Sequence, residues 1–264
     1  MKYVDYKAVY IDKTMTLQDW TAVRENAKIN LSVAGIAGSG AFDPRSLITP
    51  NLPVKSRLFV EFQNYWAENY NVKVSDELAG LNFRTVKNAA DGIEYVLKEF
   101  PAAAQCITEF KITTVEGHVM NTSYNGEIGF NPNYFNSFTS FNNKTIEWVK
   151  SLMHPKNTKI FHYGAHEAGH ILEIALIKKY GGGTIAWRDC IQSRRIVQSV
   201  FAKIEKTPDT RIFELRRAIS KSIVKKGVSI NETLAEAVMD YVANKKDASL
   251  LSVKIWEVLE EELK

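Results

Sequence analysis

Two histidines, His166 and His170, stand four positions apart, and Glu167 directly follows the first of them. Residues four apart lie on the same face of an α-helix, so the two imidazoles can reach one metal ion. His-Glu-x-x-His is a zinc-binding pattern in which the glutamate faces the open side of the metal and takes a proton from bound water. The pattern therefore predicts that His166 and His170 bind Zn²⁺ and that Glu167 is a general base.

A catalytic zinc usually has three protein ligands, so a third ligand must be found. No histidine follows His170. Glu173 lies one turn beyond His170, where a ligand from the same helix would be crowded, and we interpret it as orienting a ligating imidazole. Glu232 and Glu236 also stand four apart and share one helix face. Either could be the ligand, and a helix with exposed carboxylates is the alternative.

The two motifs are His-Glu-Ala-Gly-His at 166–170 and Asn-Glu-Thr-Leu-Ala-Glu-Ala at 231–237. Together they resemble the anthrax lethal factor type of zincin, a gluzincin-like metallopeptidase, and related metallopeptidases encoded by bacteriophages and mobile elements. The resemblance implies that Glu232 is the third zinc ligand and that Glu236 lies behind it. It also implies hydrolysis of a peptide or protein substrate through a zinc-activated water, with Glu167 as the general base.

The chain departs from that family in one respect. The family places a tyrosine about two helical turns before the ligand glutamate, whereas residues 219–226 contain none. Ser222 or a lysine could stand there, or Tyr163, Tyr180 or Tyr241 could serve from elsewhere. Loss of one oxyanion donor typically lowers the rate roughly 10²–10³-fold. The alternative hypothesis is therefore a phage or mobile-element structural protein that keeps a zinc-bound but non-catalytic zincin fold, with assembly partners in the virion or element.

The elements around the motifs predict the fold. The His-Glu-x-x-His segment lies in an apolar run that ends at Gly181-Gly182-Gly183, so we expect one long buried helix at 158–180. Alternating apolar residues predict strands at 107–114 and 118–124, followed by a hairpin turn at Asn125-Gly126. The expected fold class is α+β, a predominantly helical zincin-like domain with a small mixed β-sheet beside the active-site helix.

The segment after the hairpin turn is Glu127, Ile128, Gly129 and Phe130. The alternation of Ile128 and Phe130 fits a half-buried strand. A zincin holds its substrate in extended form against a sheet edge, and we expect this segment to be that edge strand. A strand without contact to a ligand is the alternative.

The positions of glycine and proline residues divide the chain into two predicted segments. Residues 1–55 would form an N-terminal extension, with a helix at 16–29 and a Gly/Pro-rich loop at 31–54, and residues 56–264 the catalytic domain. Further helices are expected from Leu58 onward and near 84–99.

The composition of the chain limits the compartments and partners that we expect. The chain has 264 residues, 45% of them hydrophobic, a net charge of +4, and two cysteines that we interpret as free thiols in a reducing compartment. With no signal-peptide pattern and no apolar span, we expect a cytoplasmic protein, or a virion-associated one if it is phage-encoded, and no membrane partner. Basic residues after the motif alternate with acidic ones, so we interpret them as solvated helix faces and do not expect a nucleic-acid partner.

Overall fold

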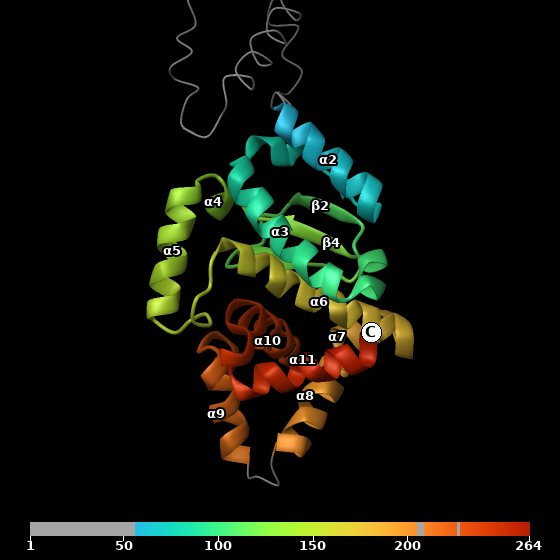
Figure 1. Cartoon of the computed structure of the whole chain (residues 1–264), viewed down its shortest axis with the longest axis vertical. Coiled ribbons are helices and arrows are strands. Elements are labelled where there is room, and N and C mark those ends of the chain that lie inside the picture. Colours follow the sequence, from blue (N-terminus) through green and yellow to red (C-terminus); the bar gives the residue numbers. More distant parts are fainter. Residues whose placement is uncertain (1–55, 205–208, 226–227) are drawn as a thin grey trace, which may run out of the picture.

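The computed structural model describes residues 56–204, 209–225 and 228–264. The expected extension at 1–55, with its helix at 16–29 and loop at 31–54, lies outside the described residues. The described part is mostly helical with a small mixed sheet, which confirms the α+β class (Figure 1). None of its helices combines the length and the apolar character that crossing a membrane requires.

Helices make up most of the described chain. The α-helices are α2 (Arg57–Tyr70), α3 (Phe83–Glu99), α4 (Pro132–Phe135), α5 (Phe138–Lys150), α6 (Ile160–Tyr180), α7 (Gly183–Arg188), α8 (Ile191–Ile204), α9 (Asp209–Ile219), α10 (Ile230–Asn244) and α11 (Leu250–Leu263). The short 3₁₀ helices are η3 (Asp76–Gly80), η4 (Pro101–Cys106), η5 (Ser222–Val224) and η6 (Lys245–Asp247).

The sheet has four short strands. They are β1 (Lys73–Val74), β2 (Glu109–Ile112), β3 (Met120–Thr122) and β4 (Glu127–Phe130), in the spatial order β1-β2-β4-β3. β1, β2 and β4 are parallel, and β3 is antiparallel to β4. The predicted turn between β3 and β4 is confirmed: the Gly126 N–H donates to the Ser123 carbonyl, and Gly126 has the positive φ of 80° that glycine accommodates without strain.

The predicted substrate edge strand is wrong. β4, which contains Glu127, Ile128, Gly129 and Phe130, pairs with β2 on one side and β3 on the other. Its main-chain donors and acceptors are used within the sheet, so a peptide cannot pair with it. Period-two alternation identifies a strand but not its neighbours, because the order of strands depends on tertiary contacts. Among the described residues, β3 is the strand at this edge.

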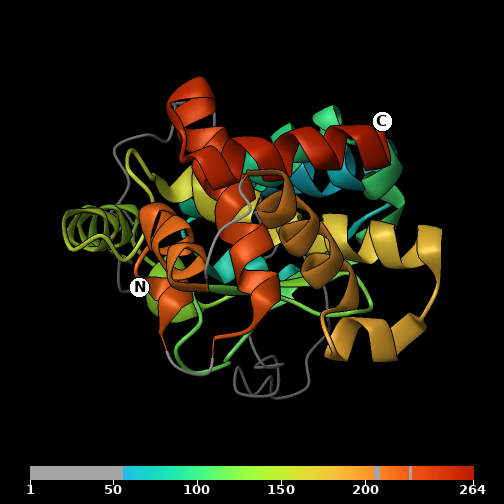
Figure 2. The same cartoon turned by 90° about the horizontal axis from the view of Figure 1, so that it is seen from below.

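Helix α6 is the central element of the fold. It runs between an upper part, formed by α2, α3 and the sheet, and a lower part, formed by α8 to α11 (Figures 1 and 2). Nearly every residue from Ile160 to Ile177 is buried, as expected for a helix that is apolar on all sides. The predicted long buried helix is thus confirmed, and it ends at Gly181, whose N–H donates to the Ile177 carbonyl.

Helices α3 and α6 cross with their backbones in contact. An added Cβ on Gly164 would lie 1.7 Å from the carbonyl oxygen of Ala89, and one on Gly92 would lie 1.8 Å from that of Phe161. Both positions therefore require glycine. This contact holds the N-terminal half of α6, and with it His166 and Glu167, at a fixed height over α3.

Candidate metal centre

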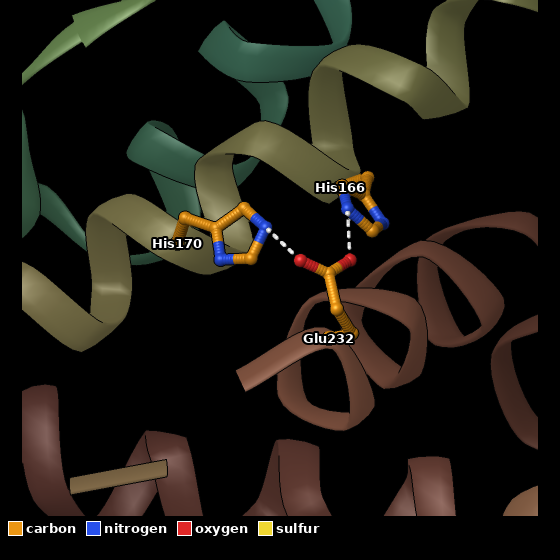
Figure 3. Close-up of side chains that lie close together, drawn as sticks. All are labelled: His166, His170 and Glu232. Atoms are coloured by element: carbon orange, nitrogen blue, oxygen red, sulfur yellow. Dashed lines mark ion pairs between the residues drawn. The ribbon is translucent and has the colours of Figure 1, made fainter. Parts of the chain in front are cut away.

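The two motif histidines and Glu232 come together across the contact between α6 and α10. The Glu232 carboxylate lies between the two imidazoles, with Oε2 at 3.3 Å from His166 Nε2 and Oε1 at 3.5 Å from His170 Nε2 (Figure 3). One ligand atom from each residue lies within 4.8 Å of the others. The three residues thus form a cluster able to hold a metal ion.

The spacing of the donor atoms is close to that around a tetrahedral ion. Bonds of about 2.0–2.1 Å in tetrahedral geometry separate neighbouring ligand atoms by about 3.3 Å. Glu232 meets each histidine through a different oxygen, at 3.3 Å and 3.5 Å, and one ligand atom from each of the three residues lies within 4.8 Å of the others. Two imidazole nitrogens and one carboxylate oxygen leave a fourth direction for another ligand.

In the cluster, the negative charge of Glu232 needs a positive partner. Burial alone would lower the pKa of His166, but the hydrogen bond and charge of Glu232 raise it to about 9. Burial would raise the pKa of Glu232, but the two imidazoles lower it to about 2. Burial lowers the pKa of His170 to about 4. Without a metal, His166 therefore carries a proton that pairs with Glu232, and a bound cation would replace that proton.

Gly169, inside the motif, allows α10 to approach. A Cβ added there would lie 2.7 Å from Ala235 Cα and 3.3 Å from Ala235 Cβ. Glu232 stands one turn before Ala235 on α10, so the close contact brings its carboxylate within reach of the histidines. The motif's glycine thus helps to define the separation of the ligands.

We expect Gly169→Ala to weaken metal binding about tenfold, because α10 must move away from α6 and carry Glu232 with it. The overpacked contact should also destabilise the fold by roughly 1–3 kcal/mol. Intrinsic helix propensity favours alanine by about 1 kcal/mol, so the expected sign opposes the local preference. Competition with a fluorescent zinc chelator and urea unfolding would measure the two effects. Unchanged affinity and unchanged or increased stability would contradict the close contact.

Glu167 lies beside the ligands and is held from the sheet. The Thr122 hydroxyl, on edge strand β3, donates to Glu167 Oε2 at 2.7 Å. Burial raises the pKa of Glu167 to about 7, although the charge of His166 and the Thr122 hydrogen bond oppose the rise. A carboxyl group with a pKa near neutrality is suited to accept and return a proton. The role of Thr122 was not predicted, because no local sequence pattern distinguishes a threonine that contacts a residue 45 positions further along the chain.

Glu236 lies behind His166, one helical turn after Glu232. Its Oε1 accepts from the Ser222 hydroxyl at 3.2 Å and lies 3.3 Å from His154 Nδ1 and 4.0 Å from His166 Nδ1. Its Oε2 is buried and has no hydrogen-bond partner among the described residues. Glu236 thus lies next to the His166 ring, at a distance too long for a hydrogen bond. Neither His154 nor the contact of Ser222 with Glu236 was predicted.

Glu173 is fully buried on α6 and faces α8. Its Oε1 accepts from the Ser193 main-chain N–H at 3.2 Å. His170 Nδ1 has no hydrogen-bond partner within the described part of the chain. The expectation that Glu173 orients a ligating imidazole is therefore wrong. Its hydrogen bond goes instead to the start of α8. Burial raises the pKa of Glu173 to about 7.

This raised pKa predicts a pH-dependent effect of Glu173→Gln. The folded protein binds the Glu173 proton more tightly than the unfolded chain does, so stability falls as pH rises from about 4.5 to about 7. Above that window the buried carboxylate costs on the order of 3 kcal/mol. Glu173→Gln should therefore unfold at higher urea than wild type at pH 8, and the difference should shrink at pH 5. A variant less stable at pH 8 would show that the carboxylate is compensated.

A cavity of about 600 Å³ opens in front of the cluster. His166, Glu167 and Glu232 line it together with His118 and Met120 from the edge-strand side. The lining also includes aromatic and apolar side chains: Tyr134, Trp148, Met153, Tyr163, Ile223 and Met239.

Of the residues that could replace the tyrosine expected before the ligand glutamate, three line the cavity and two lie away from it. Tyr163 and Ser222 line the cavity, but the Tyr163 hydroxyl is buried and without a partner among the described residues. Lys225 also lines it, seven positions before Glu232. Tyr180 instead bonds to Glu262 at the far end of α6, and Tyr241 stacks on Trp256. Neither Tyr180 nor Tyr241 can act on a group held at the cluster.

The edge strand offers free main-chain groups near the cavity. Asn131 N–H donates to the Val119 carbonyl and Ser123 N–H to the Glu127 carbonyl, so the odd-numbered residues of this strand face β4. In an antiparallel pair the intervening residues point their N–H and C=O groups the other way. Met120 and Thr122 therefore present theirs at the outer edge of the sheet.

Comparisons of this chain with protein-family models, curated proteins and solved structures gave no match. The two cysteines, Cys106 and Cys190, are free and buried as predicted.

Proposed function

We propose that this protein is a zinc-dependent metallopeptidase of the zincin type, with His166, His170 and Glu232 as ligands and Glu167 as general base. One observation carries the proposal: three ligand atoms from two helices converge within 4.8 Å beside a buried carboxyl group that is not itself a ligand. A purely structural metal site has no use for such a group.

The donor set favours zinc over calcium and magnesium. Calcium and magnesium prefer six or more oxygen ligands, whereas two imidazoles and one carboxylate are a ligand set of catalytic zinc. When bound, zinc polarises a carbonyl oxygen and lowers the pKa of a coordinated water.

The chain's own residues then account for proton transfer and substrate alignment. Glu167 accepts the proton of the attacking water and returns it to the leaving amine. Thr122 keeps the Glu167 carboxylate aimed toward the cluster. The free main-chain groups of Met120 and Thr122 can pair with an extended peptide and place its carbonyl in the cavity.

Metal analysis tests the ligand set. Wild type should hold one zinc per chain by elemental analysis, and His166→Ala and Glu232→Ala should lose it. Glu236→Gln serves as the matched control, because it changes a neighbouring carboxylate on the same helix and should weaken zinc binding without abolishing it. Zinc retained by Glu232→Ala would move the third ligand to Glu236, and no zinc in wild type after reconstitution would overturn the proposal.

A peptide-library cleavage assay separates the two functions considered for this chain. Cleavage by zinc-loaded wild type supports the peptidase. Stoichiometric zinc without cleavage of any peptide would favour the alternative, a phage or mobile-element structural protein with a zinc-bound but non-catalytic fold. The Thr122–Glu167 hydrogen bond is our reason for preferring the peptidase, because it orients a group that a structural role does not need.

A further inference from the structure

His118 lies two residues before edge strand β3, with its main chain held in place. The Asn131 side-chain amide donates to the His118 carbonyl at 2.7 Å, and the Asn131 main-chain N–H donates to the Val119 carbonyl at 3.2 Å. Pairing between the two strands therefore reaches residue 119. His118 is consequently anchored at the strand end rather than on a free loop.

His118 shares the cavity wall with strand β3. It lies two residues before Met120, the first residue of that strand, and both residues line the cavity in front of His166 and Glu232. Thr122, on the same strand, faces α6, because its hydroxyl bonds to Glu167.

The imidazole of His118 lies on the wall of the cavity in front of the cluster. The ring is exposed and has no hydrogen-bond partner within the part of the chain that the structure describes. It is therefore free to bind a group that enters the cavity.

Several other donors around the cavity are engaged or shielded. Ser222 and His154 both contact Glu236 Oε1. Ser229 lies 3.0 Å from the sulfur of Cys190. The Tyr163 hydroxyl is buried and without a partner among the described residues, and Tyr134 and Trp148 are half-buried. Among the described residues that line the cavity, His118 and Lys225 are the exposed ones whose side-chain donors have no hydrogen-bond partner.

We propose that His118 is a catalytic residue that donates an N–H hydrogen bond to the substrate oxygen that becomes negative when the carbonyl carbon is attacked. This role rests on the proposed peptidase function. It requires only the N–H that every imidazole carries, and the proton stays on the ring. A donor aimed at such an oxyanion typically contributes roughly 10²–10³-fold to the rate, which is the contribution left open by the absent tyrosine.

Anion binding tests this role without relying on turnover. The probes are inorganic phosphate and N-phosphoryl-Leu-Phe, whose tetrahedral anionic group resembles the attacked carbonyl. Calorimetry would compare zinc-loaded wild type, His118→Ala, His118→Gln and Lys225→Ala. We expect His118→Ala to weaken both probes roughly 10- to 100-fold, as for loss of a hydrogen bond to a charged group. His118→Gln, which keeps a donor, should recover part of the loss, and the melting temperature should stay that of wild type because the ring is exposed.

The outcomes separate this role from the proposed function. Equal binding by wild type and His118→Ala, a loss confined to Lys225→Ala, or no binding of either probe by wild type would overturn the role of His118. Suppose instead that wild type binds the phosphoryl dipeptide no more tightly than phosphate, while His118→Ala loses both. That result would count against a peptide substrate and still support His118 as the anion donor.

Discussion

Replacement of Glu167 by glutamine should lower peptide cleavage roughly 10²–10⁴-fold while the zinc content stays at one per chain. Glutamine has nearly the same shape, and its amide oxygen can still accept the Thr122 hydrogen bond. It cannot accept the proton of the attacking water. The measurement is the initial rate of cleavage of one library-selected peptide, with elemental analysis of the same sample.

Glu173→Gln is the matched control for that experiment. Both residues are buried glutamates of α6, and burial raises the pKa of each to about 7. Glu173, however, bonds to the start of α8. The control should cleave at nearly the wild-type rate. Equal losses in the two variants would indicate that any change in the buried charge of α6 impairs cleavage, and wild-type activity in Glu167→Gln would exclude Glu167 as the base.

Gly164→Ala should destabilise the fold by roughly 3 kcal/mol or more. The added Cβ would lie 1.7 Å from the Ala89 carbonyl oxygen and 2.7 Å from its carbonyl carbon, so a backbone must move. That cost is a large share of the roughly 5–15 kcal/mol by which a domain of this kind is stable. Urea unfolding followed by circular dichroism would measure it.

Gly92→Ala examines the same helix crossing from the other side. Its Cβ would lie 1.8 Å from the Phe161 carbonyl oxygen, so it should be about as destabilising as Gly164→Ala. Because either change already separates α3 from α6, the double variant should lose clearly less than the sum of the two single losses. Strictly additive effects, or losses below about 1 kcal/mol, would show that the helices do not touch at these glycines.

Local patterns in the sequence determined the helix of the cluster and the side chains that it presents on one face. Four-residue spacing puts His166 and His170 on one face whatever the rest of the chain does, because the helix repeat is a property of the backbone. The apolar run and the glycine triplet likewise determined the extent of α6, from Ile160 to Tyr180. Period-two alternation and Asn125-Gly126 identified the strands and their turn.

Tertiary structure alone decided which distant residues join that helix. The sequence alone leaves open whether Glu232 or Glu236 is the third ligand. The contact of Gly169 with Ala235 places Glu232 between the imidazoles and Glu236 behind them. Strand order moved the free edge from β4 to β3, and with it came Thr122 and His118. The physical reason is the same in each case: a backbone repeat is local, whereas the neighbours of a helix or a strand depend on how side chains from remote segments pack.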